Sequence, residues 1–196
     1  IIDYGMKTKA KTYILLFIIT LAPFAAMAQK ISLGSCTIEE QGVKGVYKGE
    51  MASGKPYGKG SALYENGNNY EGQFVKGKRH GYGTFTFADG EKYEGEWVLG
   101  QQNGRGTYYF SNNNKYVGLW FRDYQQGHGV MYYFNGDVYD GDWFHDMRQG
   151  HGKYTFSTGA YYDGQWKNDK KEGKGFFDWG DGNTYRGNWL DNQRSG

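Results

Sequence analysis

The sequence contains a single cysteine, Cys36, so no disulfide can form within the chain and its stability must come from packing. Only 2 of the 196 residues are proline, and the 33 glycines lack the every-third-residue spacing that a collagen-like fibre requires. An excess of one charge is also missing, because the chain from Gln29 onward has 20 basic and 20 acidic residues. This balance argues against a nucleic-acid-binding protein driven by bulk electrostatics.

The sequence also lacks an apolar run long enough to cross a bilayer. Its longest run, residues 13–26, has about 14 residues, whereas a spanning helix needs ~20. Three lysines precede this run after Met6, and the small residues Ala26 and Ala28 follow it, as in a secretory signal peptide. We therefore expect residues 1–28 to be a signal peptide and the protein to be exported to the periplasm, cell envelope or exterior. A retained membrane anchor is the alternative.

Residues 29–46 show no clear periodicity and are predicted to form a linker or an irregular first strand that caps the array. Residues 33–36 (Leu-Gly-Ser-Cys) look like the lipobox of a bacterial lipoprotein. Lys30 lies between this stretch and the apolar run, where such signals are normally uncharged. An incidental free cysteine is therefore favoured over lipid anchoring through Cys36.

A repeat of 23 residues organises the rest of the chain, residues 47–196, as six full units and a truncated seventh. A tyrosine opens each unit, a glycine follows two residues later, and a tryptophan recurs in the last five units. Of the 33 glycines, 28 fall on five repeat positions, which chance does not produce. The positions are Tyr47, Tyr70, Tyr93, Tyr116, Tyr139, Tyr162 and Tyr185; Gly49, Gly72, Gly95, Gly118, Gly141, Gly164 and Gly187; and Trp97, Trp120, Trp143, Trp166 and Trp189.

Within a unit, large residues alternate with others at period two, which predicts two β-strands. In the second unit Tyr70 and Phe74 share a face with Gly72 between them, and Gly83 shares a face with Phe85. A glycine between aromatics leaves room for a ring of a neighbouring strand to lie across it. We assign these glycines a packing role.

Two kinds of turn are predicted to join the strands. The first has Gly, Asp or Asn at its centre, the residues that most readily adopt positive φ. The second is an Asn-Gly or Asp-Gly turn, such as residues 66–67 and 89–90, with Asn113 in place of glycine in the third unit. The central positions of the first turn are Gly54, Gly77, Gly100, Asp123, Asp146, Asp169 and Asn192.

The predicted fold is all-β: an elongated, single-sheet solenoid of tandem β-hairpins with an aromatic ladder along one face. Strands ~4.8 Å apart advance the stack by roughly 10 Å per repeat. The recurring tryptophans are expected to pack in the core rather than to form a ligand-stacking platform.

Units such as residues 93–97 (Tyr-Glu-Gly-Glu-Trp) followed by residues 104–108 (Gly-Arg-Gly-Thr-Tyr) resemble MORN (membrane occupation and recognition nexus) repeats, here of bacterial type behind a signal peptide. The resemblance covers residues 47–196. It implies a β-hairpin solenoid used for protein–protein contact, scaffolding or membrane attachment, without enzyme activity or a cofactor. Asp123, Asp146 and Asp169 depart from the usual glycine and are expected to alter only the turn surface.

Patterns that mimic enzyme or metal sites have simpler explanations. Residues 49–55 and 72–78 resemble a phosphate-binding loop, but Pro56 and Arg79 follow where that motif needs a hydroxyl. His128 and His151 lie one repeat apart, about 10 Å, which is too far for two ligands of one zinc ion. We predict no catalytic residue, no metal and no cofactor.

Charge is expected to separate along the two long edges of the sheet. Acidic residues such as Glu65, Asp89 and Glu94 are assigned to one edge, and the turns within hairpins should form a basic edge. The candidate edge for an anionic partner consists of Lys55, Lys76, Lys78, Arg79, Arg122, Arg148, Lys167, Lys170 and Lys171, with Arg194 beside them.

A solvated surface without a partner is the alternative to this edge. The predicted function is an exported scaffold that contacts a protein partner or an anionic membrane or envelope surface, without nucleic acid or small-molecule substrate. The alternative is a lipid-binding targeting module of a larger enzyme, similar to MORN arrays fused to a lipid kinase. That reading follows from an array that stops at Gly196, within its seventh unit.

Overall fold

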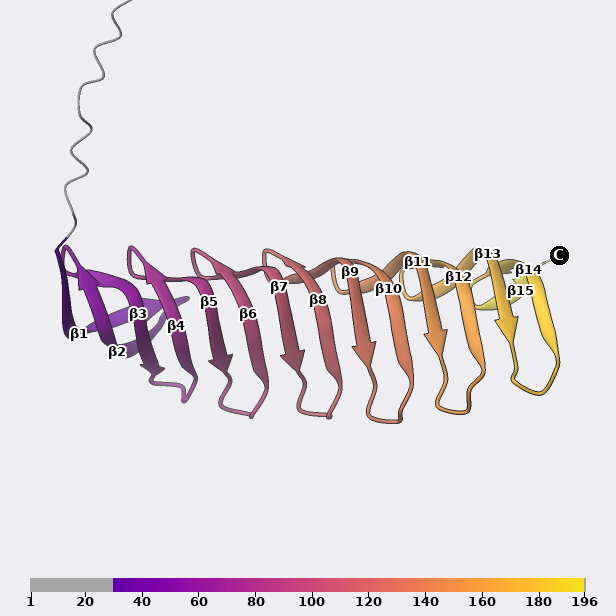
Figure 1. Ribbon diagram of the computed structural model, residues 1–196, viewed down its shortest axis with the longest axis horizontal. Coiled ribbons are helices and arrows are strands. Elements are labelled where there is room, and N and C mark those ends of the chain that lie inside the picture. Colours follow the sequence, from indigo (N-terminus) through magenta and orange to yellow (C-terminus); the bar gives the residue numbers. More distant parts are fainter. Residues whose placement is uncertain (1–29, 196) are drawn as a thin grey trace, which may run out of the picture.

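The computed structural model describes residues 30–195, which form one antiparallel sheet of 15 strands arranged in chain order (Figure 1). Each 23-residue unit contributes two strands, which confirms the predicted hairpin solenoid. The strands are β1 Ile31–Glu40, β2 Val43–Ala52, β3 Lys55–Tyr64, β4 Asn69–Val75, β5 Lys78–Thr86, β6 Lys92–Val98, β7 Gln101–Tyr109, β8 Lys115–Phe121, β9 Tyr124–Tyr132, β10 Val138–Phe144, β11 Met147–Thr155, β12 Tyr161–Lys167, β13 Lys170–Asp178, β14 Thr184–Leu190 and β15 Gln193–Ser195.

Residues 29–46, predicted to be a linker or an irregular first strand, contain the regular strand β1 and the start of β2. Strand β1 pairs with β2 in unbroken register from Ile31 opposite Ala52 to Glu40 opposite Val43. The hairpin forms because Cys36, in the middle of β1, packs with neighbouring apolar residues against the aromatic core. Periodicity was weak here because most side chains of this edge strand are exposed. The expected signal peptide, residues 1–28, lies outside the described residues.

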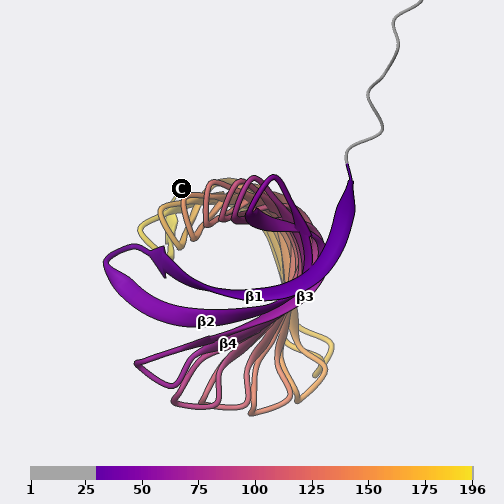
Figure 2. The same cartoon turned by 90° about the vertical axis from the view of Figure 1, so that its left-hand side faces the viewer.

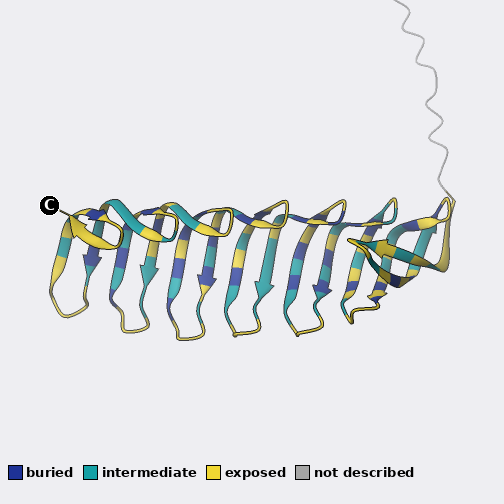
Figure 3. Cartoon of the chain, turned by 180° about the vertical axis from the view of Figure 1, so that it is seen from behind, coloured by how far each residue is buried: buried dark blue, intermediate teal, exposed yellow. Residues whose placement is uncertain are grey.

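The sheet curves into a trough. Figure 2, a view along its long axis, shows the ends of the hairpins curling over the concave face. The tight turns within hairpins follow the upper edge of Figure 1 and the longer turns between hairpins follow the lower edge. Figure 3 shows buried and exposed residues alternating along the strands, while the turns are exposed. No helix in the part described is long and apolar enough to cross a membrane.

A β-bulge in most hairpins contributes to the bend. In the fourth unit the register of β8 and β9 shifts between Gly118 and Trp120, and Gly127 adopts a φ of 72°. A residue with a side chain is strained at this φ, and a bulge increases the local twist and bend of a strand. The first glycine of each Gly-x-Gly pair is therefore a backbone requirement, a role that the sequence analysis did not assign.

The core is a zigzag of aromatic rings on the concave face. Tyr116 lies between Trp120 of its own unit and Trp143 of the next, each with a centroid distance of 5.3 Å and nearly perpendicular planes. The indole nitrogen of Trp143 donates to the carbonyl of Gly129 at 3.1 Å. The repeated tryptophans are at most 6 % exposed, which confirms their core role. Edge-to-face pairs are worth about 0.5–1.5 kcal/mol beyond burial of their area.

Six of the seven repeated tyrosines lie over two glycines, and Tyr185 lies over Gly187 alone. The Tyr116 hydroxyl donates to the carbonyl of Leu119 at 3.0 Å, and its ring passes over Gly118 of its own strand and Gly129 of the neighbouring strand. A Cβ at either glycine would collide with this ring. The predicted packing role is therefore correct for Gly129, whereas the ring over Gly118 comes from the same strand.

The tight turns join successive units. Arg122 and Asp123 have φ values of 51° and 71°, the geometry of a type I′ turn, which confirms the predicted left-handed positions. Asp123 donates its backbone N–H to the carbonyl of Gln102, 21 residues earlier, at 3.1 Å. Its side-chain oxygen accepts the N–H of the same Gln102 at 2.7 Å. The aspartates at this position are thus clamps between units and not merely a change in the turn surface.

The longer turns form a second ladder of hydrogen bonds. Asn114 accepts the N–H of Phe134 at 2.9 Å, and Asp137 accepts that of Ser157 at 2.8 Å. The predicted left-handed residue is also present, since Asn113 has a φ of 64° where the other units have glycine. Hydrogen bonds therefore join successive units along both edges of the sheet.

Candidate functional site

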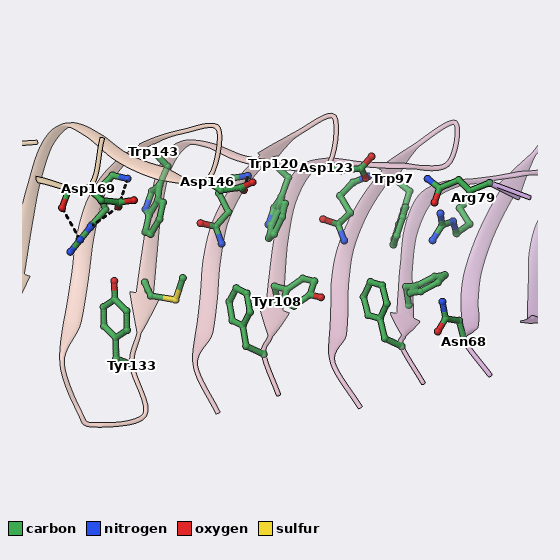
Figure 4. A pocket seen from close by; sticks show the side chains of 18 residues that line it. Asn68, Arg79, Trp97, Tyr108, Trp120, Asp123, Tyr133, Trp143, Asp146 and Asp169 are labelled. Atoms are coloured by element: carbon green, nitrogen blue, oxygen red, sulfur yellow. Dashed lines mark hydrogen bonds and ion pairs between the residues drawn. The ribbon is translucent and has the colours of Figure 1, made fainter. Parts of the chain in front are cut away.

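The concave face holds a groove of about 860 Å³ that extends over most of the array (Figure 4). The β1–β2 turn lies at its N-terminal end, where Gln41 contributes to the lining. Three rows of side chains line the rest. Two rows are aromatic, and Trp120 belongs to one of them and Tyr133 to the other. The third row is polar and lies at the start of every second strand.

The polar row reads Arg79, Gln102, Gln125, Arg148 and Lys171 in successive units. Each member is the cross-strand partner of an aromatic residue in its own hairpin, for example Gln102 of Trp97 and Gln125 of Trp120. The row therefore lies on the same face as the tryptophans. Three of its members had been assigned to the basic edge. Arg79 and Arg148 line the groove instead, and Lys171 lies on the same face of the sheet without lining it.

Arg79 is buried and cannot contact an external anion. Its Nε lies 3.0 Å from a carboxylate oxygen of Glu40, and its Nη2 donates to the carbonyl of Gly100 at 2.9 Å. The guanidinium also stacks 4.2 Å from the ring centroid of Trp97. Its assignment to the anionic-partner edge was wrong, because curvature of the sheet turns this position inward.

Arg148 and Lys171 also occupy the concave side. Arg148 forms an ion pair with Asp169 at 2.9 Å and lies 4.4 Å from the ring centroid of Trp166. Lys171 lies 4.9 Å from the ring centroid of Trp189. Burial, together with the positive charge of Arg148, lowers the pKa of Lys171. Neither residue faces outward from the hairpin tips.

The other predicted edge residues are exposed near the tight turns: Lys55, Lys76, Lys78, Arg122, Lys167 and Lys170. Lys170 is partly neutralised by Asp191 at 2.7 Å, which raises the pKa of the lysine. Most of these residues lie in the first two units and the sixth unit. The basic edge is therefore interrupted in its middle.

Apolar side chains occupy that middle section, a feature that the sequence analysis missed. Phe121 and Phe144 are each 48 % exposed and Tyr124 is 47 % exposed. His145 stacks between neighbouring units, 4.3 Å from the ring of Phe144 and 4.8 Å from that of Tyr124. We call this set the tip stripe: Val98, Leu99, Phe121, Tyr124, Phe144 and Met147.

The signal for the tip stripe was present in the repeat alignment. The position after the tryptophan is Val98, Phe121 and Phe144 in three successive units but Lys167 in the next. An exposed apolar patch spanning several units is uncommon on a protein surface and marks an interaction site.

The acidic residues are not confined to the opposite edge. Asp140 and Asp163 lie within strands on the convex face, where they pair with His128 at 3.2 Å and His151 at 3.1 Å. Glu94 is similarly placed and pairs with Lys92 at 2.7 Å. Within residues 30–195, no group of three or more His, Cys, Asp or Glu side chains could hold a metal ion.

These features define an open β-hairpin solenoid in which successive hairpins stack and expose one long groove and one apolar stretch of turn edge. A family model described as MORN repeat matches seven consecutive segments: residues 47–69, 70–92, 93–115, 116–138, 139–161, 162–184 and 185–196. The chain belongs to the MORN-repeat family. No curated protein sequence matches it.

Solved structures that are similar to this fold include two TCP domains. The SAS-4 (dCPAP) TCP domain of Drosophila melanogaster, in complex with a proline-rich motif of Ana2 (dSTIL), is 10 % identical, with 93 % of this chain and 97 % of that chain covered and a TM-score of 0.45. The TCP10 domain of Danio rerio CPAP, in complex with a STIL peptide, is 9 % identical, with 78 % and 97 % covered and a TM-score of 0.25. We draw no functional inference from either likeness.

Proposed function

We propose that this chain is an exported, non-catalytic scaffold that binds a protein partner along its hairpin tips. The tip stripe carries the proposal: three neighbouring units expose aromatic or aliphatic residues at their tips. The flanking units have Lys78 and Lys170 at the position that Tyr124 and Met147 occupy. Aromatic residues are enriched at protein interfaces and lysine is depleted there, so the stripe has the composition of a contact surface with a basic rim.

The rigid backing of the stripe supports this role. Each tip is tied to the preceding unit through its turn, as Asp146 is to Gln125 by bonds of 3.2 and 2.8 Å. A surface held this way loses little conformational entropy when a partner binds. The proposed export rests on the signal-peptide pattern of residues 1–28, and N-terminal sequencing of the mature protein tests it.

The test of the proposed function uses the double variant Phe121→Ser/Phe144→Ser, which removes the aromatic centre of the stripe. Its control is Phe134→Ser, because Phe134 is 75 % exposed in a longer turn on the other edge. We expect affinity purification from the native envelope to recover a defined protein with the wild type and the control, but not with the double variant. Recovery of the same protein with all three chains contradicts the proposal.

Attachment to an anionic membrane is the second candidate, favoured by lysines on both sides of the stripe. A basic residue near an anionic surface is worth about 1 kcal/mol, and aromatic residues suit the bilayer interface. Flotation of the full chain with liposomes distinguishes the candidates. Salt-sensitive binding to anionic but not neutral vesicles supports the membrane, and equal recovery with both excludes it.

A further inference from the structure

The middle of the groove contains two glutamine side chains whose amides are open to the groove. Gln102 and Gln125 are 7 % and 5 % exposed, and both line the groove. Their backbone N–H groups bond to Asp123 and Asp146, but no hydrogen bond joins either side-chain amide to another of residues 30–195. Unlike the amide oxygen of Gln126, which is buried without a partner, these two amides are free to form hydrogen bonds with a ligand that lies in the groove.

The flanking members of the same row differ. Arg79 is satisfied by Glu40 and by Gly100, and Arg148 is satisfied by Asp169. The side-chain amides that are free to bind a ligand therefore lie between these two arginines, where glutamine replaces arginine in two successive units. The walls of this section are aromatic and include Tyr108, Phe110 and Tyr133.

The length of one repeat unit along the groove favours one backbone conformation for an elongated ligand. Two strands ~4.8 Å apart advance the array by about 9.6 Å per unit. A polyproline II segment advances ~3.1 Å per residue and completes a turn in three residues, about 9.3 Å. A β-strand repeats its side-chain direction after ~6.6 Å. An α-helix rises about 5.4 Å per turn, which also does not match the repeat of the array.

We propose that the groove between Arg79 and Arg148 binds a polyproline II segment of about nine residues, one turn of the segment for each unit of the array. Polyproline II has no internal hydrogen bonds, so its carbonyls are free to accept the side-chain amides of Gln102 and Gln125. Its three-fold symmetry places equivalent side chains against equivalent aromatic walls, as in other aromatic grooves that bind such segments.

The charges in the groove set a preference within this ligand class. Asp123 and Asp146 line the groove, and neither forms an ion pair with another described residue, whereas Glu40 and Asp169 already neutralise the two arginines. A basic residue in the segment is therefore favoured over an acidic one. This site is separate from the tip stripe and does not depend on it.

The test is calorimetric titration of the full chain with three ten-residue peptides. Decaproline adopts polyproline II, (Thr-Val)5 favours a strand, and (Glu-Pro-Pro)3-Glu keeps the triplet spacing but adds acidic residues. We expect binding in the order decaproline, then the acidic peptide, with none for the strand-forming peptide. Substituting both glutamines, Gln102→Leu and Gln125→Leu, is expected to weaken decaproline binding roughly tenfold or more. The double variant lacks the two side-chain amides that donate hydrogen bonds to the carbonyls of the peptide.

The matched control is Gln126→Leu, because Gln126 is adjacent in sequence but does not line the groove. Circular dichroism establishes that both variants retain the sheet. The proposal is overturned if decaproline fails to bind the wild type, if the strand-forming peptide binds equally well, or if the double variant binds decaproline as tightly as the control. The variant Phe121→Ser/Phe144→Ser should bind decaproline normally, which separates this site from the proposed tip interface.

Discussion

The Nε atom of Arg79 lies 3.0 Å from a carboxylate oxygen of Glu40, 39 residues earlier in the chain. This ion pair joins the β1–β2 hairpin to the second unit and lies beside the N-terminal end of the groove. The hydroxyl of Tyr64 donates to the same carboxylate at 2.6 Å. The first hairpin is thus tied into the array by a buried polar network.

Glu40→Ala should lower the free energy of unfolding by about 3 kcal/mol, because it leaves the Arg79 charge buried without its partner. The control is Glu94→Ala, which breaks the partly exposed pair with Lys92 and should cost less than about 1 kcal/mol. Urea denaturation followed by tryptophan fluorescence measures both. Equal effects would show that the Arg79–Glu40 pair has no special structural role.

Gly118→Ala should destabilise the protein by about 3 kcal/mol, because a Cβ there meets the Tyr116 ring and the backbone of Gly129. Gly90→Asn is the control, since no atom lies within 4 Å of a Cβ at Gly90 and Asn113 holds the equivalent left-handed position. The control should change stability by about 0.5 kcal/mol or less. Comparable losses in thermal denaturation would refute the close packing of tyrosine on glycine.

Asp146→Asn should leave stability nearly unchanged, because Asn192 accepts the N–H of Lys171 at the equivalent place, at 2.8 Å. Asp146→Ala should cost about 1–3 kcal/mol, since it removes the acceptor for Gln125 and places alanine at a φ of 65°. Chemical denaturation of the two variants tests the clamp. An alanine variant as stable as the asparagine variant would contradict it.

Acidification should weaken the edge formed by the longer turns. Burial alone would raise the pKa of Asp137, but hydrogen bonds from Tyr154, Ser157 and Asn135 outweigh it, and its pKa lies below the usual 3.8. A lowered folded-state pKa gives stability that is present above pH ~4 and lost as pH falls further. Asp137→Asn should therefore show a smaller loss of stability between pH 4 and 2, measured by denaturation at each pH. An unchanged pH profile would contradict this assignment.

The sequence predicted the repeats, the strands, the left-handed turns and the aromatic core because each depends on local spacing. Tyr116 and Trp120, for example, recur at fixed positions, and alternation alone places them on one face. The predicted hairpin solenoid and its MORN-type units are therefore confirmed.

The remaining features depend on curvature and on contacts between distant residues. Arg79 was assigned to the exposed basic edge because the sequence does not show that the hairpin ends curl inward. It also does not show that Glu40 lies close enough to form an ion pair with Arg79. Strand β1 was predicted only as a linker or an irregular first strand, because a mostly exposed edge strand has little periodicity. The repeat alignment shows the apolar residues of the tip stripe, but their exposure depends on how the hairpin tips are placed in the fold.

The most direct test of the central claim is photo-cross-linking in the native envelope, with a photoreactive phenylalanine analogue placed at Phe121 or at Phe134. Phe121 lies in the tip stripe, and Phe134 is an exposed control on the opposite edge. We predict one discrete protein adduct from position 121 and none from position 134. The same adducts from both positions, or adducts to lipid alone from position 121, would contradict a protein-binding scaffold that works through its hairpin tips.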